Sequence, residues 1–163
     1  MPAFAVNGFL PLGRHSVSLG DAESMLVSAP QFRDSPTRRT LWDGLISYLD
    51  VFLALEDTYE GLLNGIPLIH RVWLGGSFVS TKLDPRNIDT TLLIDTDAER
   101  SVRGHRVAHV FEPERFTPEE RTYFTERGVW DDWWQRCRLP DQEDRSPSER
   151  SAAPARGYLE VRL

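Results

Sequence analysis

The chain has only one cysteine among its 163 residues, which excludes an internal disulfide bond and a cysteine-built zinc cluster. It has no uninterrupted run of about 18 apolar residues, so we expect no membrane-spanning helix. The first residues lack the basic start and long apolar centre of a signal peptide. The net charge of −6 argues against an extended nucleic-acid surface, which needs an excess of basic side chains. These absences predict a cytoplasmic protein without a membrane partner.

The residues that are present indicate one globular domain over residues 1–163, with an apolar share of 40% that suffices for a core. Residues 1–34 mix turn residues with apolar ones. They predict an ordered, helical N-terminal arm, in which Ser18 caps a short helix over residues 18–28. Residues 141–156 are polar and rich in proline and serine, which is typical of a flexible loop.

A long helix is predicted between Ser35 and Gly65. Ser35 is a favourable N-cap, and the proline that follows it suits the first helical turn. Gly65 and Pro67 are typical of a helix end. Between these limits, apolar side chains recur at helical spacing and should form one buried stripe: Leu41, Leu45, Tyr48, Phe52, Leu55, Tyr59 and Leu62.

Several segments after this helix have the composition of strands. Residues 66–74 and 88–95 are mostly apolar or β-branched, and they predict two neighbouring strands of one sheet in a βαβ-like core. A third strand is expected at residues 106–111. A helical region follows, and its second helix should cover residues 129–139 with Cys137 in an apolar stripe.

The last seven residues, 157–163, alternate between apolar and other side chains and predict a closing strand with one buried face. Leu159 and Val161 would lie on the buried face, and Tyr158 and Glu160 on the other. The sequence of helices and strands as a whole predicts an α+β fold with a mixed β-sheet.

A glycine-glycine-serine turn at Gly75, Gly76 and Ser77 precedes Asn87 and Asp89 in the chain. Glycines let backbone N–H groups approach a phosphate closely, and the serine hydroxyl adds one more donor. Side chains two residues apart on a strand share a face, so positions 87 and 89 can act on one ligand. This combination is typical of a site that holds a triphosphate beside divalent metal ions.

These residues resemble the signature of the polymerase-β-like nucleotidyltransferase superfamily. More narrowly, two segments are similar to a bacterial family of nucleotidyltransferase-like domains with the pattern GxLPxGxH followed by GSFxxxKxxPxDID. They are GFLPLGRH, at residues 8–15, and GSFVSTKLDPRNID, at residues 76–89. With the helix between them, they cover most of residues 8–95. The resemblance implies a nucleotidyltransferase-like mixed sheet with flanking helices and a helical N-terminal arm.

The resemblance also implies roles for individual residues. Gly75, Gly76 and Ser77 would hold the phosphates of a nucleoside triphosphate, and Lys82 could bind a phosphate as well. Asp89 would be the principal Mg²⁺ ligand and a catalytic residue. Each has a structural alternative. The Gly-Gly-Ser turn would bind no ligand, Lys82 would be a lysine exposed to solvent, and Asp89 would be a carboxylate that caps the turn.

Asn87 departs from the family pattern, which has aspartate at this position. An amide offers a carbonyl oxygen without charge, so Asn87 is the poorer Mg²⁺ ligand of the catalytic pair. The superfamily usually supplies a third carboxylate from a later strand, and Glu112 and Glu160 are candidates without a diagnostic spacing. Asp95 lies past the far end of the Asp89 strand, roughly 20 Å away, and should not complete the same metal site.

Two functional hypotheses follow from this pattern. The first is a nucleotidyltransferase that moves a nucleotidyl group from a nucleoside triphosphate to a hydroxyl of a protein or nucleic acid. The second is a catalytically degenerate relative that binds a protein partner, such as an antitoxin-like or defence-system component. The Gly-Gly-Ser turn and Asp89 favour the first hypothesis, and the missing charge at Asn87 favours the second.

Overall fold

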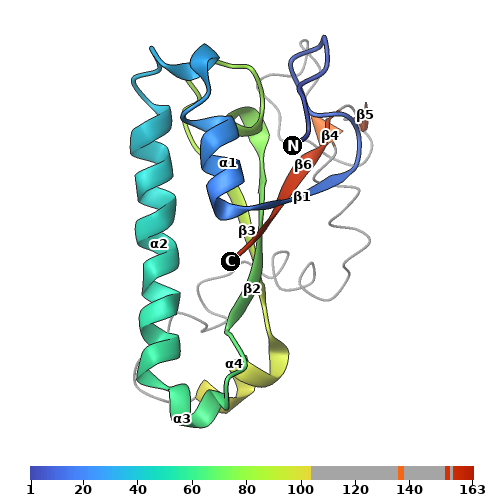
Figure 1. Cartoon of the computed structure of the whole chain (residues 1–163). Coiled ribbons are helices and arrows are strands. Elements are labelled where there is room, and N and C mark those ends of the chain that lie inside the picture. The colour runs from blue at the N-terminus through green and yellow to red at the C-terminus, as the bar shows by residue number, and fades with distance from the viewer. Residues whose placement is uncertain (104–135, 138–152, 155) are drawn as a thin grey trace.

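The computed structural model describes residues 1–103, 136–137, 153–154 and 156–163 (Figure 1). Within these residues, no helix is long and apolar enough to cross a membrane. The elements in chain order, with two short 3₁₀ helices labelled η, are β1 (Arg14–Ser18), α1 (Leu19–Leu26), η1 (Pro30–Phe32), α2 (Arg38–Thr58), α3 (Glu60–Leu63), β2 (Ile69–Gly75), η2 (Gly76–Val79), β3 (Asp89–Ile94), α4 (Thr96–Val102), β4 (Arg136–Cys137), β5 (Ala153–Pro154) and β6 (Tyr158–Arg162).

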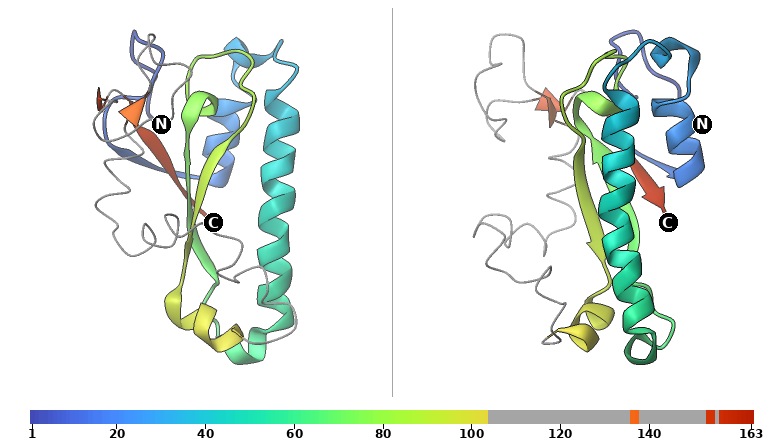
Figure 2. Two further views of the ribbon diagram at one scale, coloured as in Figure 1. Left: turned by 180° about the vertical axis from the view of Figure 1, so that it is seen from behind. Right: turned by 90° about the vertical axis from the view of Figure 1, so that its left-hand side faces the viewer.

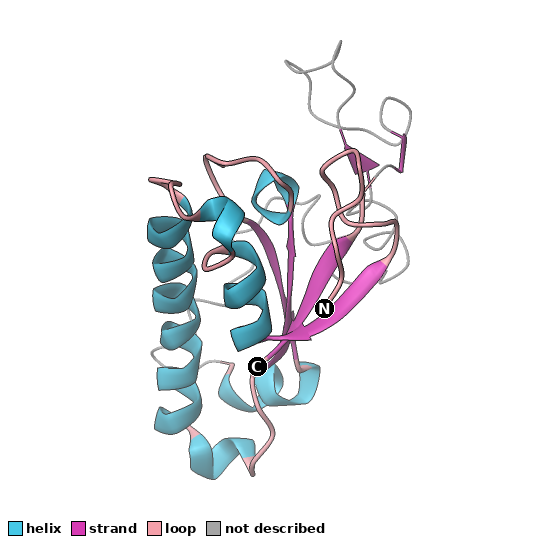
Figure 3. Cartoon of the chain, turned by 45° about the horizontal axis from the view of Figure 1, so that its top comes forward, coloured by secondary structure: helices cyan, strands magenta, loops and turns pink. Residues whose placement is uncertain are grey.

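Four of the strands form one mixed sheet in the order β1-β6-β2-β3 (Figure 3). The first strand, β1, runs parallel to β6, and β2 runs antiparallel to both β6 and β3. Strands β4 and β5 form a separate two-stranded ladder. This arrangement confirms the predicted α+β class with a mixed sheet.

Helices α1 and α2 cover one face of the sheet (Figure 2). Apolar side chains from these helices pack against Val72 and Leu74 of β2 and against Leu159 and Val161 of β6 to form the main core. The opposite face carries a second cluster, in which the rings of Trp73 and Tyr158 lie 5.0 Å apart. Because successive strand residues point to opposite faces, the two clusters use alternate positions of the same strands.

The short helix α1 begins as the sequence predicts. The Ser18 hydroxyl accepts a hydrogen bond of 3.1 Å from the backbone N–H of Asp21, which is the expected N-cap. Ala22, Met25 and Leu26 then recur on one helical face and are buried.

The long helix differs from its prediction at both ends and in part of the face it buries. It ends at Thr58, and the separate helix α3 follows; Leu45, Phe52 and Leu55 of the predicted stripe are buried as expected. It begins at Arg38 rather than Ser35, because the Ser35 hydroxyl accepts from the backbone N–H groups of Thr37 and Arg38 and so holds a turn before the helix. Tyr48 and Leu62 of the predicted stripe are exposed. Trp42 and Leu49, which were not in the predicted stripe, are buried instead. The ring of Trp42 stacks on that of Phe78 with the ring centroids 6.4 Å apart.

The prediction that residues 66–74 and 88–95 form neighbouring strands is confirmed, since Val72 pairs with Leu92 in the ladder between β2 and β3. The expected βαβ-like connection is wrong. The segment between these strands contains only the short helix η2, so β3 turns back and pairs antiparallel instead of crossing over.

Strands β1 and β6 also differ from the prediction. Strand β1 falls within the arm of residues 1–34, for which the sequence predicted no strand. Strand β6 is central and buries both faces, because β1 and β2 flank it and Tyr158 and Glu160 are buried beside Leu159 and Val161.

Cys137 lies in strand β4 and not in the predicted helix, since it pairs with Ala153 in a backbone ladder. Of the predicted loop at 141–156, residues 153–154 form β5. The predicted strand at 106–111 and the remainder of the predicted helical region lie outside the described residues, as does Glu112.

Candidate functional site

The Gly-Gly-Ser turn and Asp89 lie side by side at one end of the β2–β3 ladder. Gly75 is the last residue of β2 and pairs with Asp89, the first residue of β3. Gly76 has a φ of 66°, in the left-handed region that favours glycine. A Cβ on Gly76 would lie 2.7 Å from Cγ of Asp89, so only glycine lets the turn approach this carboxylate. The structure therefore brings together three of the residues that the sequence predicts for the site.

Asn87 also lies at this site. Its side-chain Nδ2 donates a hydrogen bond of 2.6 Å to Oδ1 of Asp89, and both residues are exposed. The other carboxylate oxygen of Asp89 faces the Cα of Gly76. Oδ1 of Asp89 thus accepts a hydrogen bond from the neutral amide of Asn87. An acidic residue at position 87 would instead repel this carboxylate.

Ser77 and Lys82 lie on the segment between the turn and β3. The Ser77 carbonyl accepts a hydrogen bond of 2.7 Å from the Ser80 hydroxyl, which in turn accepts from the backbone N–H of Lys82 at 3.2 Å. Ser77 is half-buried and Lys82 is exposed. These contacts fix the backbone of both residues, while phosphate binding by their side chains stays a prediction.

Arg38, the first residue of α2, is buried and donates hydrogen bonds to the backbone of residues 78–83. Its residue is only 1% exposed, and burial lowers the pKa of its guanidinium to about 10, although the charge of Asp84 acts in the opposite direction. No pattern in the sequence indicates this role for Arg38, because an arginine at the start of an amphipathic helix is usually exposed. Its guanidinium donates to the backbone carbonyls of Leu26, Phe78, Ser80, Lys82 and Leu83.

The N-terminal arm contacts the segment from another side. The backbone N–H of Thr81 donates to the carbonyl of Gly8 at 2.8 Å, and Phe9 forms an isolated antiparallel bridge with Ser80. His15 lies farther along the arm, where its Nε2 is 2.8 Å from the carbonyl oxygen of Pro11. The two sequence segments that carry the family resemblance therefore contact each other through their backbones.

Asp95 lies at the opposite end of β3 from Asp89, as the sequence predicts, and has a structural role. Its side chain accepts from the backbone N–H groups of Asp97 and Ala98 and caps α4. It also lies 3.1 Å from Nε2 of His70. The hydrogen bond from Ala98 and, next, that from His70 lower the pKa of Asp95 below its usual value.

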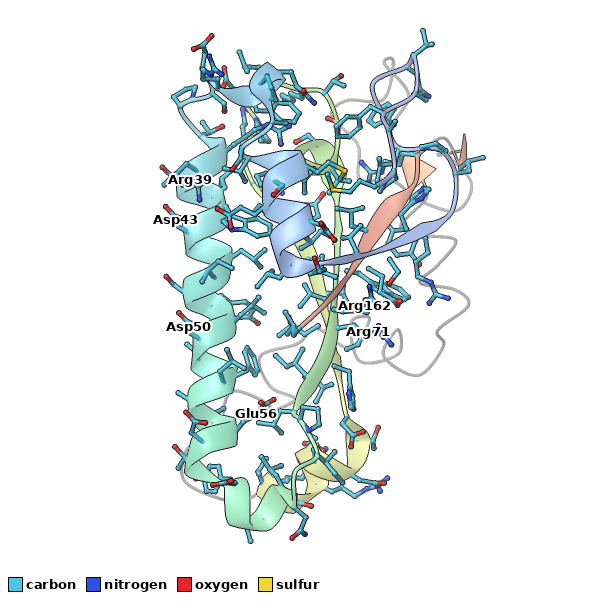
Figure 4. All side chains as sticks on the ribbon, in the orientation of Figure 1. Arg39, Asp43, Asp50, Glu56, Arg71 and Arg162 are labelled. Atoms are coloured by element: carbon cyan, nitrogen blue, oxygen red, sulfur yellow. The ribbon has the colours of Figure 1, made fainter. Side chains whose placement is uncertain are left out.

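Glu160 is a buried carboxylate on the sheet face of Trp73 and Tyr158. It accepts a hydrogen bond of 3.0 Å from the indole nitrogen of Trp73 and lies 3.4 Å from a guanidinium nitrogen of Arg14. Arg71 contributes a more distant ion pair at 3.8 Å, and Figure 4 shows it beside β2. Strand β2 separates Glu160 from the strand of Asp89, so Glu160 is not positioned as a third ligand of the same metal ion.

The donor set limits which metal could bind. Within the described part of the chain, no three His, Cys, Asp or Glu side chains group together as a metal site. In this part of the chain, the site offers one carboxylate, Asp89, with the amide of Asn87 beside it. Such a set fits a single Mg²⁺ that arrives with a triphosphate, because Mg²⁺ is often held by one carboxylate together with phosphate oxygens and water.

The fold and the site define a class: an α+β domain in which a glycine turn at the end of one strand faces an aspartate at the start of the next. A family model described as a family of unknown function, DUF6932, matches residues 2–162, so the chain belongs to this family. Among the curated proteins and the solved structures, none matches the chain.

Proposed function

We propose that this chain is a nucleotidyltransferase-type protein that binds a nucleoside triphosphate with Mg²⁺ and transfers the nucleotidyl group to a hydroxyl of a protein or nucleic acid. One observation carries the proposal: Gly76 has no side chain and a φ of 66°, and it lies directly against the Asp89 carboxylate. At this short range, the turn can bind the phosphates of a triphosphate while the aspartate binds the metal ion that the same phosphates coordinate.

Different residues would bind the phosphates and the metal ion. Backbone N–H groups of Gly75, Gly76 and Ser77 would donate to phosphate oxygens, since successive N–H groups in a turn form a concave anion site. Asp89 would hold the Mg²⁺ that accompanies the triphosphate, and the ion would neutralise part of the phosphate charge. Lys82 is exposed and follows closely in the chain, and its ammonium group would add positive charge near the phosphates.

The transfer step is a displacement at the α-phosphorus. The hydroxyl oxygen of the acceptor forms a bond to this phosphorus, the bond to the bridging oxygen breaks, and pyrophosphate leaves with the electron pair. The proton of the hydroxyl passes to solvent. Since the described residues of the site supply one carboxylate for metal binding, their contribution is mainly to hold the triphosphate and orient it.

A label-transfer experiment tests this reaction. Purified protein is incubated with Mg²⁺ and each triphosphate, labelled either at the α- or at the γ-phosphate, with a cell extract as the source of acceptors. The proposal predicts that α-label becomes attached to a macromolecule while γ-label leaves as pyrophosphate, and that Asp89→Asn abolishes attachment. Attachment of γ-label would instead indicate phosphoryl transfer and contradict the proposal.

The hydrogen bond from Asn87 to Asp89 supports a second candidate. A neutral amide that occupies one carboxylate oxygen suits a degenerate domain whose role is to bind a protein partner in the cytoplasm, as an antitoxin-like or defence-system component. This candidate predicts no label transfer in the experiment above. It also predicts that Mg²⁺ has no effect on the stability of the protein in the presence of triphosphate.

A further inference from the structure

The guanidinium of Arg38 is a charged group that is buried and whose described hydrogen bonds all go to backbone carbonyls. Burial of an isolated charge costs several kcal/mol unless its donors are satisfied. Arg38 satisfies them with five hydrogen bonds, of which four are 2.8 Å or shorter. Its charge also lies 3.6 Å from the ring centre of Phe32, within the range of a cation–π interaction.

The acceptors of these hydrogen bonds have a common location. One belongs to Leu26 at the end of α1, and the others all lie between Phe78 and Leu83. Residues 78–83 directly follow the Gly-Gly-Ser turn and lead toward Asn87 and Asp89. The side chain of Arg38 therefore fixes residues 78–83 at four positions. These residues form the first part of the connection between the Gly-Gly-Ser turn and Asp89.

The geometry points to Arg38 as a positioning residue of this site, an inference that rests on the proposed function. We infer that Arg38 holds residues 78–83 in one conformation and thereby sets the position of the Gly75–Ser77 turn relative to Asp89. Arg38 itself is buried beneath the segment and does not reach a bound triphosphate. This role needs the planar guanidinium with its several N–H donors, because a lysine retains the charge but cannot donate to several carbonyls in fixed directions.

Hydrogen–deuterium exchange of the full-length protein tests the positioning role. In Arg38→Lys we expect the exchange of amides in residues 76–89 to accelerate at least tenfold, while amides in the ladder between β2 and β6 keep their protection. The matched control is Arg39→Lys. Arg39 is the next residue of α2 (Figure 4) and is exposed, and it pairs with Glu23 at the surface. The exchange profile of Arg39→Lys should therefore equal that of the wild type.

Triphosphate affinity gives the functional readout. Arg38→Lys should weaken the binding of Mg²⁺–triphosphate about tenfold, and Arg39→Lys should leave it unchanged. Faster exchange spread evenly over the whole sheet would overturn the positioning role, because Arg38 would then be a general stabiliser. Unchanged exchange in residues 76–89 would overturn it too.

A second variant covers the case in which Arg38→Lys does not fold. Arg38→Gln removes the buried charge and keeps amide N–H donors for the nearest carbonyls, so it should fold and show the same localised acceleration. Normal protection of residues 76–89 in Arg38→Gln, with Arg38→Lys unfolded, would overturn the inference. Failure of the wild type to bind any triphosphate contradicts the proposed function, whereas the exchange experiment tests whether Arg38 holds the segment.

Discussion

Asn87 donates a hydrogen bond of 2.6 Å from its side-chain nitrogen to Oδ1 of Asp89. At this distance, two carboxylates would repel each other in the absence of a cation, whereas an amide and a carboxylate attract. The site is therefore stable without metal. The same relationship limits metal affinity, since only one of the two side chains carries a charge.

Replacing Asn87 with aspartate should make the protein dependent on Mg²⁺. The two side chains have nearly the same size, so the substitution changes mainly the charge. Two unit charges about 4 Å apart at an effective dielectric near 20 attract by about 4 kcal/mol before desolvation and screening. Even a third of this raises affinity about tenfold. Asn87→Asp should therefore melt at a lower temperature without Mg²⁺ and regain the loss with Mg²⁺ and triphosphate.

Thermal denaturation with and without Mg²⁺ checks this prediction, with Asn87→Ser as the control that removes the amide without adding charge. We expect Asn87→Ser to gain no more stability from Mg²⁺ and triphosphate than the wild type does, because it keeps Asp89 and adds no charge. If Asn87→Asp also gains no more than the wild type, the site has lost more than one charge, and the second candidate function gains support.

Gly76 should be intolerant of any side chain. Its φ of 66° is strained for alanine, and the new Cβ would meet the Asp89 carboxylate. We expect Gly76→Ala to destabilise the protein by about 2 kcal/mol or more. The control is Gly44→Ala on the exposed side of α2, where nothing lies within 4 Å of the added Cβ, and which should stabilise the protein by about 0.5–1 kcal/mol. Urea denaturation of both variants measures these differences, and equal stability of the two would contradict the geometry of the turn.

Glu160 should be important for stability rather than for the site at Asp89. Glu160→Ala leaves the Trp73 indole N–H and the nearby guanidinium of Arg14 without their acceptor. We expect a loss of about 2–3 kcal/mol, and a smaller loss in Glu160→Gln, which retains an acceptor for the indole. Chemical denaturation followed by circular dichroism measures both. Asp43→Ala, an exposed change on α2, should stay within about 0.5 kcal/mol of the wild type.

The charge of Asp95 should stabilise the protein only above acidic pH. The folded state lowers the pKa of Asp95 below its ordinary value of 3.8, so the unfolded state takes up the proton first as pH falls. Its contribution is full above pH 3.8 and disappears as pH falls through the folded pKa. Asp95→Asn retains a capping oxygen without the charge. Its melting temperature should lie below that of the wild type at pH 7 and approach it near pH 3; a constant difference across this range would contradict the pKa shift.

Local patterns were enough to predict much of the fold and the centre of the site. Strands β2 and β3 consist mostly of apolar or β-branched residues on the two sides of a glycine turn, and both were predicted within a few residues of their observed bounds. The proximity of Gly76, Asn87 and Asp89 follows from this hairpin-like arrangement, because residues at the ends of adjacent strands meet without any long-range contact.

Long-range contacts account for what the sequence did not predict. Strand β1 contains one buried apolar residue, Val17, and it forms because β6 from the other end of the chain pairs beside it. The buried face of α2 was predicted only in part for a similar reason. Leu45, Phe52 and Leu55 are buried as expected, but Trp42 and Tyr48 are both suited to a core and only the position of the sheet selects Trp42. Arg38 could not be identified because its acceptors are backbone carbonyls, which leave no pattern in the sequence.

Calorimetric titration of ATP, GTP, CTP and UTP, each with and without Mg²⁺, into the wild-type protein and Asp89→Asn tests whether Asp89 binds a Mg²⁺–triphosphate. The wild type should bind at least one triphosphate only when Mg²⁺ is present, and Asp89→Asn should bind it at least tenfold more weakly. No binding of any triphosphate by the folded wild-type protein, or binding that depends on neither Mg²⁺ nor Asp89, would contradict the proposed function.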